Sequence, residues 1–90
     1  MFYVYILQSK SDGGWYTGYT PDLRERILAH NAGKVRSTKS RVPLSLLYYE
    51  ACHNLHDARA RERYLKTGMG KRYLKQRLKF FLKNGASNGL

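Results

Sequence analysis

The sequence is poor in cysteine, proline and acidic residues, and it lacks long apolar runs. Its 90 residues include one cysteine, Cys52, two prolines and six acidic residues. A single cysteine allows no disulfide within the chain and no cysteine-based zinc site. No apolar run approaches the ~18 residues of a transmembrane helix, and Met1 leads straight into strand-like sequence without the basic segment of a signal peptide. We therefore expect a cytoplasmic protein with no membrane partner.

The scarcity of acidic residues leaves a large positive charge. The chain has 17 lysines and arginines, and its formal net charge is +11. So much charge on one small domain favours a polyanionic partner, and nucleic acid is the best candidate. The alternative is a basic protein that uses its charge for solubility alone.

Three segments rich in aromatic and β-branched residues predict strands. They are residues 2–8, 15–19 and, after Pro43, 44–51. Asp12, Gly13 and Gly14 lie between the first two segments and predict a tight turn. The first two strands should therefore pair as an antiparallel hairpin.

Three helices are expected from capping residues and apolar spacing. They cover about residues 20–32, with Thr20 as N-cap, 55–67, with Asn54 as N-cap, and 71–83, after a break at Gly68-Met69-Gly70. The order strand–strand–helix–strand–helix–helix predicts an α+β fold, in which three helices flank a three-stranded, antiparallel-type sheet. We expect a single domain over residues 1–83 and a flexible tail over 84–90.

The first predicted helix combines an apolar face with two groups suited to phosphate chemistry. Leu23 and Ile27 should face the core, and Arg26 and His30 should lie at the edge of that face. Arginine is the side chain that grips a phosphate with two parallel hydrogen bonds. The alternative, which the spacing alone favours, is a solvated arginine and a surface histidine.

On the second predicted helix, Glu62 lies in the middle of an otherwise apolar face. A lone carboxylate there is costly unless it is paired or binds a metal ion. Mg²⁺ takes only one or two protein carboxylates and keeps several waters, so one glutamate suffices. An ion pair with an arginine of the same helix is an equally good explanation.

Tyr5 and Tyr16 should lie on neighbouring strands of the hairpin. Tyrosine is common in strands, so both are expected to pack as ordinary aromatics on frequency alone. A phenol beside a metal ion and basic groups has a second use, because its lowered pKa lets it act as a base. Tyr48 and Tyr49 on the third strand are expected in the core.

Two basic segments suit contacts with a nucleic-acid backbone. The alternative for the first of them is a solvated, mobile loop. The candidate residues are Lys34, Arg36, Lys39 and Arg41 in the loop of residues 34–41, and Lys71 and Arg72 at the start of the third predicted helix.

Taken in order, these features resemble the GIY-YIG nuclease superfamily. The first motif is matched by Tyr3-Val4-Tyr5 and the second by Tyr16-Thr17-Gly18. The arginine and histidine of the family's helix are matched by Arg26 and His30, and its metal-binding glutamate by Glu62. Tyr3 stands where the motif has glycine, and Thr17 where it has isoleucine. The resemblance runs from Phe2 to about Leu82 and is closest to the small stand-alone bacterial members.

The resemblance implies an endonuclease that hydrolyses phosphodiester bonds in DNA, selects a DNA structure or single strands, and serves DNA repair or recombination. It implies that Glu62 binds Mg²⁺ or Mn²⁺ and that Tyr16 or Tyr5 activates or orients the attacking water. Arg26 would stabilise the charge that develops on the phosphate, and His30 would assist proton transfer. No small-molecule cofactor is expected. The alternatives are a basic nucleic-acid-binding module without catalysis and a protein-interaction module.

Overall fold

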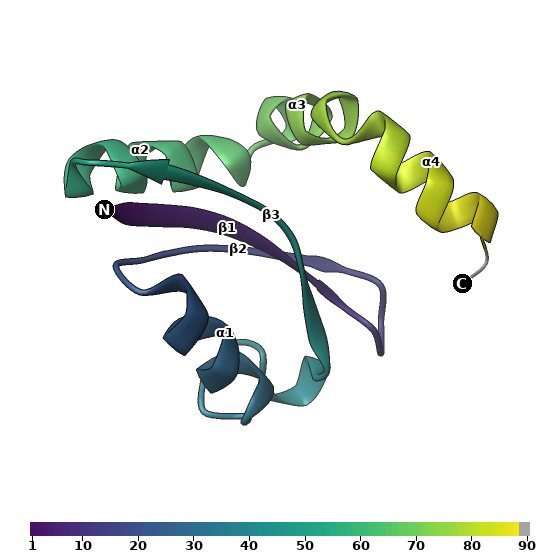
Figure 1. Ribbon diagram of the computed structural model, residues 1–90, viewed down its shortest axis with the longest axis horizontal. Helices are drawn as coiled ribbons and strands as arrows, with labels where there is room; N and C mark the ends of the chain where they lie inside the picture. Colours follow the sequence, from purple (N-terminus) through teal and green to yellow (C-terminus); the bar gives the residue numbers. More distant parts are fainter. Residues whose placement is uncertain (89–90) are drawn as a thin grey trace.

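The computed structural model describes residues 1–88, with side chains described through Asn84 (Figure 1). Its elements in chain order are β1 (Phe2–Ser9), β2 (Trp15–Thr20), α1 (Leu23–Asn31), the 3₁₀ turn η1 (Lys39–Arg41), β3 (Leu44–Cys52), α2 (Leu55–Leu65), α3 (Gly68–Arg77) and α4 (Lys79–Asn88). No helix in this part of the chain is long and apolar enough to cross a membrane. The α+β class and the order of the first five main elements are as predicted.

The sheet has three antiparallel strands in the order β2-β1-β3. β1 is the central strand, and β2 and β3 form the two edges. The hairpin predicted between β1 and β2 is present, with Tyr5 opposite Gly18. The turn uses Gly13 in a left-handed conformation with φ of 75°, where a side chain would be strained.

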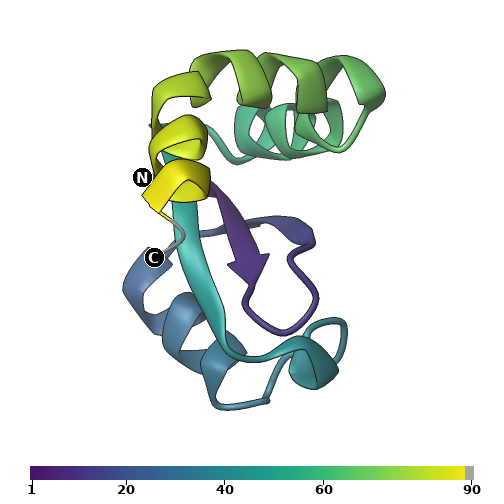
Figure 2. The ribbon, with the colours of Figure 1, turned by 90° about the vertical axis from the view of Figure 1, so that its right-hand side faces the viewer.

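Helices cover both faces of the sheet, with α1 on one side and α2 and α3 on the other (Figures 1 and 2). Successive side chains of a strand point to opposite faces, so β1 is buried on both. Val4 and Ile6 pack with Ala58, Leu65 and Leu74 of α2 and α3. Tyr5 and Leu7 form a second core with Leu44, against which Leu23 and Ile27 of α1 pack.

Helix α1 starts two residues later than predicted. Its N-cap is Asp22, whose side chain accepts a hydrogen bond from the backbone N–H of Glu25 at 3.1 Å. Thr20 ends β2 instead, and its hydroxyl accepts from the N–H of Asp22. The helix stops at Gly33 as expected, because this glycine adopts a φ of 73° that allows the chain to leave the helix.

The C-terminal helices differ from the prediction in two places. Asn54 caps α2 as predicted, but Gly68 to Gly70 form the first turn of α3, whose N-cap is Thr67. Gly70 is buried against the end of α2, where a Cβ would collide with the Tyr64 carbonyl oxygen. The helix is interrupted again at Leu78, so the single helix predicted over residues 71–83 is replaced by the two helices α3 and α4.

Helix α4 continues past residue 83, where the sequence predicts the end of the domain and the start of the tail. The backbone stays helical to Asn88, and residues 89–90 lie outside the described part of the chain. The break at Leu78 also turns Phe81 away from the core face that Leu74 occupies, and Phe81 is exposed. A flexible tail over residues 84–90 therefore stays a prediction, and the backbone of residues 84–88 is helical.

Candidate active site

A buried row of hydrogen bonds links β1 to the loop that follows α1. The Tyr5 hydroxyl lies 2.8 Å from Nε2 of His30, and Nδ1 of His30 lies 2.7 Å from the Thr38 hydroxyl. All three residues are 0% exposed. Thr38 was not among the residues predicted from sequence.

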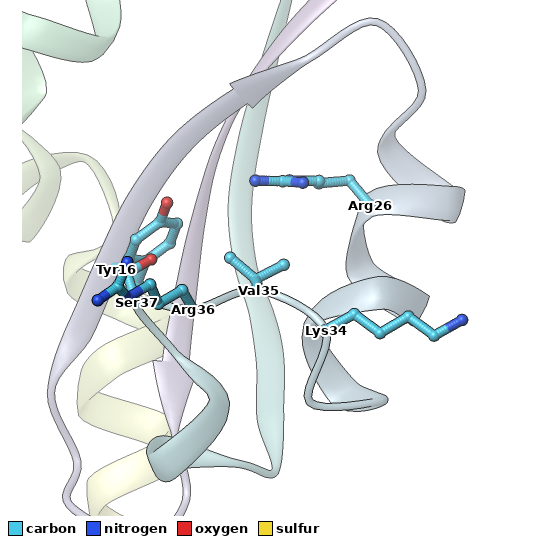
Figure 3. A pocket seen from close by; sticks show the side chains of 6 residues that line it. All are labelled: Tyr16, Arg26, Lys34, Val35, Arg36 and Ser37. Atoms are coloured by element: carbon cyan, nitrogen blue, oxygen red, sulfur yellow. The ribbon is translucent and has the colours of Figure 1, made fainter.

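Arg26 joins this row from the same helix as His30. The two residues are four positions apart in α1, which places them on one face of the helix. The Arg26 Nε–H donates to the Tyr5 hydroxyl oxygen at 3.4 Å. This bond fixes one edge of the guanidinium, and the group also lines an open cavity (Figure 3). The structure therefore brings together Tyr5, Arg26 and His30, as the sequence predicted.

His30 is neutral at pH 7. Its burial, and secondarily the positive charge of Arg26, lower its pKa from 6.5 to about 4. A neutral imidazole carries one N–H. In the described structure the Thr38 hydroxyl has no acceptor other than His30, so leaving that proton unpaired would be costly.

The assignment that pairs the Thr38 proton has Thr38 donating to Nδ1 and the Nε2–H of His30 donating to Tyr5. The Tyr5 oxygen then accepts from both His30 and Arg26. Burial raises the pKa of Tyr5, and the hydrogen bond from Arg26 opposes that rise without cancelling it. Tyr5 is therefore a protonated phenol at neutral pH.

Tyr16 occupies edge strand β2 and reaches both the buried row and the cavity. Its ring contacts His30 edge-on at 5.1 Å between centroids, and it lies 6.3 Å from the ring of Tyr5. It is half-buried and lines the open cavity (Figure 3). Of the two predicted tyrosines, Tyr16 is the one placed to touch a molecule in that cavity.

Gly18 makes room for the phenol of Tyr5. A Cβ at this position would lie 2.5 Å from the Tyr5 hydroxyl and 3.1 Å from the ring of Tyr16. No other residue fits opposite Tyr5 without displacing it. The glycine of the second motif thus has a direct steric role at the site.

The open cavity has a volume of about 670 Å³ and a basic lining. The residues that line it are Tyr16, Arg26, Lys34, Val35, Arg36 and Ser37 (Figure 3). Three of these six carry a positive charge, and none is acidic. The electrostatic character of the cavity suits an anionic group such as a phosphodiester.

Glu62 belongs to α2, on the opposite face of the sheet from α1. Its side chain is 15% exposed and forms an ion pair with Lys66 at 2.8 Å. The predicted alternative was an ion pair with a nearby arginine, but none of the ion pairs among the described residues joins Glu62 to an arginine. Arg61 of the same helix instead binds Glu50 through two hydrogen bonds of 2.8 and 2.9 Å. Within residues 1–84, Glu62 makes no hydrogen bond with the other predicted catalytic residues.

The Arg26 cavity and the surroundings of Glu62 approach each other at edge strand β2. Lys66, the partner of Glu62, lines a second cavity of about 210 Å³ that Tyr16 also lines. The negative charge of Glu62 is one of the smaller contributions that raise the pKa of Tyr5. Tyr16 therefore stands between the Arg26 cavity and the neighbourhood of Glu62.

The residues of the site can hold a divalent ion only if the substrate supplies further ligands to that ion. No cluster of three or more histidine, cysteine, aspartate or glutamate side chains occurs among the described residues. Glu62 offers a single carboxylate. Mg²⁺ is commonly held by one or two carboxylates together with substrate phosphates and waters, which this arrangement can accommodate.

The predicted phosphate-binding residues divide into three groups. Lys34 and Arg36 line the cavity of Arg26, and Lys71 lines the second cavity. Lys39 and Arg72 are exposed on η1 and α3. For these residues, phosphate contact stays a prediction.

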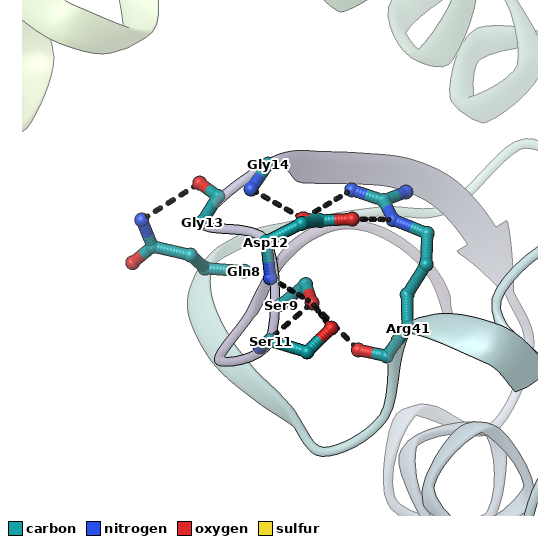
Figure 4. Close-up of polar contacts among 7 residues, drawn as sticks. All are labelled: Gln8, Ser9, Ser11, Asp12, Gly13, Gly14 and Arg41. Atoms are coloured by element: carbon teal, nitrogen blue, oxygen red, sulfur yellow. Dashed lines mark hydrogen bonds and ion pairs between the residues drawn. The ribbon is translucent and has the colours of Figure 1, made fainter.

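Arg41 has a structural partner in the β1–β2 turn. Its Nε lies 2.9 Å from Asp12, and its carbonyl accepts a hydrogen bond of 2.6 Å from the buried Ser9 hydroxyl (Figure 4). The Ser9 hydroxyl also accepts from the N–H groups of Ser11 and Asp12. Arg41 therefore ties the loop after α1 to the hairpin turn.

Comparison with known proteins identifies the family. The family model for the GIY-YIG catalytic domain matches residues 1–74. The chain belongs to the GIY-YIG family. Relatives include a UPF0213 protein of Pediococcus acidilactici, 40% identical over 87 residues that cover 93% of this chain and 84% of the relative. A UPF0213 protein of Clostridium perfringens is 46% identical over 67 residues, 73% and 71% of the two chains.

A solved structure supports the same assignment. The solution NMR structure of a UPF0213 protein from Bacillus halodurans matches with a TM-score of 0.51 and 40% identity, covering 82% of each chain. The resemblance found in the sequence is thus confirmed, together with the α+β fold. GIY-YIG membership implies a nuclease-type activity on nucleic acid.

Proposed function

We propose that this GIY-YIG domain is a divalent-metal-dependent endonuclease that cleaves DNA. The observation that carries the proposal is the row Tyr5–His30–Thr38, which holds Arg26 at the mouth of a basic cavity. Buried, fully hydrogen-bonded groups keep their orientation without reorganisation, and such preorganised groups stabilise charge that develops in a transition state.

Arg26 has the role of binding the scissile phosphate. Its guanidinium carries five N–H donors, and the bond to Tyr5 uses only Nε. The remaining N–H groups suit two parallel hydrogen bonds to phosphate oxygens. Lys34 and Arg36 add positive charge around the same cavity and draw the DNA backbone toward it.

Tyr16 has the role of orienting the attacking water. It lines the cavity beside Arg26, whereas Tyr5 is fully buried and protonated. Tyr5 and His30 then act by holding Arg26 and the ring of Tyr16 in place. Their contribution is hydrogen bonding and ring packing, since His30 is already neutral and Tyr5 has a raised pKa.

Glu62 is the residue that would hold the divalent ion, as Mg²⁺ or Mn²⁺. A bound ion of this kind supplies Lewis-acid stabilisation of a phosphate and acidifies coordinated water. To hold the ion, Glu62 would give up its ion pair with Lys66. The freed ammonium group of Lys66 lies at the second cavity with Tyr16, where it can bind a neighbouring phosphate.

Small size supports a substrate recognised by shape. A domain of this size is small for carrying both a cutting site and an extended reader of the major groove. We therefore propose branched, flapped or single-stranded DNA as the substrate, and a role in DNA repair or recombination.

A nucleic-acid-binding module without catalysis is the second candidate. The ion pair between Glu62 and Lys66 favours it, because that pair occupies the carboxylate proposed to hold the ion. The two candidates differ in turnover and agree on salt-sensitive binding.

The test is cleavage of a panel of labelled DNAs by the purified protein. Single-stranded, flapped, branched and blunt duplex substrates are incubated with Mg²⁺, with Mn²⁺ or with chelator. The endonuclease proposal predicts cutting that needs a divalent ion and is faster on substrates with unpaired segments. Salt-sensitive binding to every substrate without cutting would overturn it in favour of the binding module.

A further inference from the structure

We propose that an unpaired strand of the nucleic acid leaves the active site over Trp15, with a base stacked on that ring and its phosphates held by Lys71 and Lys75. The inference rests on the proposed function only in taking nucleic acid as the substrate. It adds a binding subsite outside the row of catalytic candidates and specifies which part of the substrate must be unpaired.

The subsite is inferred from three neighbouring cavities that share lining residues. Tyr16 lines both the Arg26 cavity and the second cavity, so the two meet at this ring. Trp15 and Lys71 line both the second cavity and a third one of about 380 Å³, which Lys75 and Gly13 also line. The three cavities therefore follow one another along β2, from Arg26 past Tyr16 and Trp15 to the β1–β2 turn. We call the second and third cavities together the Trp15 groove.

Trp15 is suited to stacking by its position in the sheet. It is the first residue of β2 and half-buried, and it packs against the core cluster of Val4, Ile6 and Leu74. This packing holds the ring in place, while its remaining surface lines the groove. An ordered aromatic surface next to positive charge is the arrangement by which proteins bind single strands, since every base has a face that can stack.

The lysines of the Trp15 groove are available for phosphates. Lys71 and Lys75 are both exposed and lie one helical turn apart in α3, on the same face. Neither forms an ion pair within the described residues. Lys66 lines the same groove but is paired with Glu62.

An unpaired strand is required because stacking on Trp15 needs a free base face. In a continuous duplex, neighbouring base pairs cover both faces of each base, and only the phosphate backbone is open to contact. A duplex can thus bind the lysines but cannot use the tryptophan. This difference makes the subsite testable.

Intrinsic fluorescence reports on the groove directly, because Trp15 is the one tryptophan of the chain. The protein is titrated in chelator, where no metal-dependent cleavage occurs, with an oligothymidylate of about 12 nucleotides, which fits the range of single-strand site sizes. A blunt duplex of the same length and inorganic polyphosphate serve as controls. Saturable quenching by the single strand alone is expected. Equal quenching by duplex or polyphosphate, or binding of the single strand without quenching, would overturn the proposal.

Paired charge variants separate the groove from general electrostatics. Lys71→Gln with Lys75→Gln removes two charges from the groove, and Lys79→Gln with Lys83→Gln removes two from α4, outside the three cavities. In the first variant, the slope of log affinity against log salt for the single strand should fall by about 1.4, or about 0.7 for each lost phosphate contact. The second variant should keep the wild-type slope, and equal effects of both pairs would contradict the subsite.

Two substitutions of the tryptophan separate stacking from packing. Trp15→Leu keeps apolar bulk for the core but removes the aromatic face, and Trp15→Phe keeps both. By anisotropy of a labelled oligothymidylate, Trp15→Leu should weaken binding roughly 5- to 150-fold, the range for loss of one stacked base. Trp15→Phe should retain most of the affinity. Equal affinities of the two folded variants would refute stacking.

Failure of the subsite and failure of the proposed function look different. A protein that never cuts DNA but shows the expected quenching and the lysine-specific loss of affinity has the groove without the catalysis. A protein that cuts DNA with a divalent ion but gives no quenching and no lysine-specific effect has the catalysis without the groove.

Discussion

His30 should make the fold sensitive to mild acid. The imidazole is 0% exposed, lies between Tyr5, Tyr16 and Thr38, and has Arg26 on the same helix face. Its pKa is lowered to about 4 in the folded protein, against an ordinary value of 6.5. The unfolded chain therefore takes up a proton near pH 6.5, and the folded chain resists it until about pH 4.

The sign and size follow from proton linkage. Above pH 6.5 both states are neutral at His30, and the folded state carries no penalty. As the pH falls from 6.5 to 4, the unfolded state gains the proton and the free energy of unfolding declines. The gap between about 4 and 6.5 corresponds to about 3 kcal/mol, all of it lost below pH 4.

Urea unfolding at a series of pH values from 7.5 to 4.5 measures this loss. With an m-value of about 1 kcal/mol/M for a small domain, the midpoint of the wild-type protein should fall by about 2 M more than that of His30→Gln, which has no titrating ring. The pKa values of Asp12 and Glu50 are lowered by their arginine partners, so both proteins lose those contributions alike at lower pH. Parallel plots of the urea midpoint against pH for the two proteins between pH 7 and 4.5 would show that burial does not lower the pKa of His30 in the folded protein.

Three further substitutions test the site. Thr38→Val should cost about 1–3 kcal/mol of unfolding free energy in urea, because it leaves a buried imidazole nitrogen without a partner, and Thr38→Ser should restore it. Gly18→Ala places a Cβ 2.5 Å from the Tyr5 hydroxyl. This substitution should slow cleavage and lower the melting temperature by an amount equivalent to about 1–3 kcal/mol of stability. An unchanged melting temperature and cleavage rate would contradict the close approach of Gly18 to Tyr5. Arg26→Gln should slow single-turnover cleavage about 10²- to 10³-fold while changing DNA affinity less than tenfold. The control Arg24→Gln, which changes an exposed neighbour on the same helix, should leave the cleavage rate unchanged. A loss of affinity in Arg26→Gln as large as its loss of rate would mean that Arg26 only binds the DNA backbone.

The strands were readable from sequence because local chemistry determines them. β1 is a run of aromatic and β-branched residues buried on both faces, and the glycine-rich turn fixes its pairing with β2. Tyr49 shows the limit of that approach. It was expected in the core, but β3 is an edge strand and Tyr49 is 50% exposed. Composition identifies a strand but does not say which neighbours cover it.

The helix boundaries were harder because glycine has two uses. Gly33 ends α1 through a positive φ, as the sequence suggested. Gly70 looked like a second stop but is a contact residue, where the absence of a side chain lets α3 start against the end of α2. Only the packing of the two helices distinguishes these uses.

The structure brings the candidate residues Tyr5, Arg26 and His30 together, but it places His30 deeper than the sequence indicated. The spacing of Arg26 and His30 placed both at the edge of a helix face, whereas His30 is fully buried because the loop after α1 returns over it with Thr38. A threonine in a basic loop gives no periodic signal. The available clue was chemical, since a histidine next to an apolar helix face needs a partner on each ring nitrogen.

The most direct test of the account is single-turnover cleavage by Glu62→Gln in Mg²⁺, on the best DNA substrate of the wild-type protein. Glu25→Gln, which removes an exposed carboxylate from α1, and Lys66→Gln, which breaks the ion pair of Glu62 without removing the carboxylate, are the matched controls. We predict that Glu62→Gln abolishes metal-dependent cleavage while DNA affinity stays within a few-fold of the wild type, and that Glu25→Gln cleaves normally and Lys66→Gln retains metal-dependent cleavage. Cleavage by Glu62→Gln at the wild-type rate would show that Glu62 does not hold the catalytic ion.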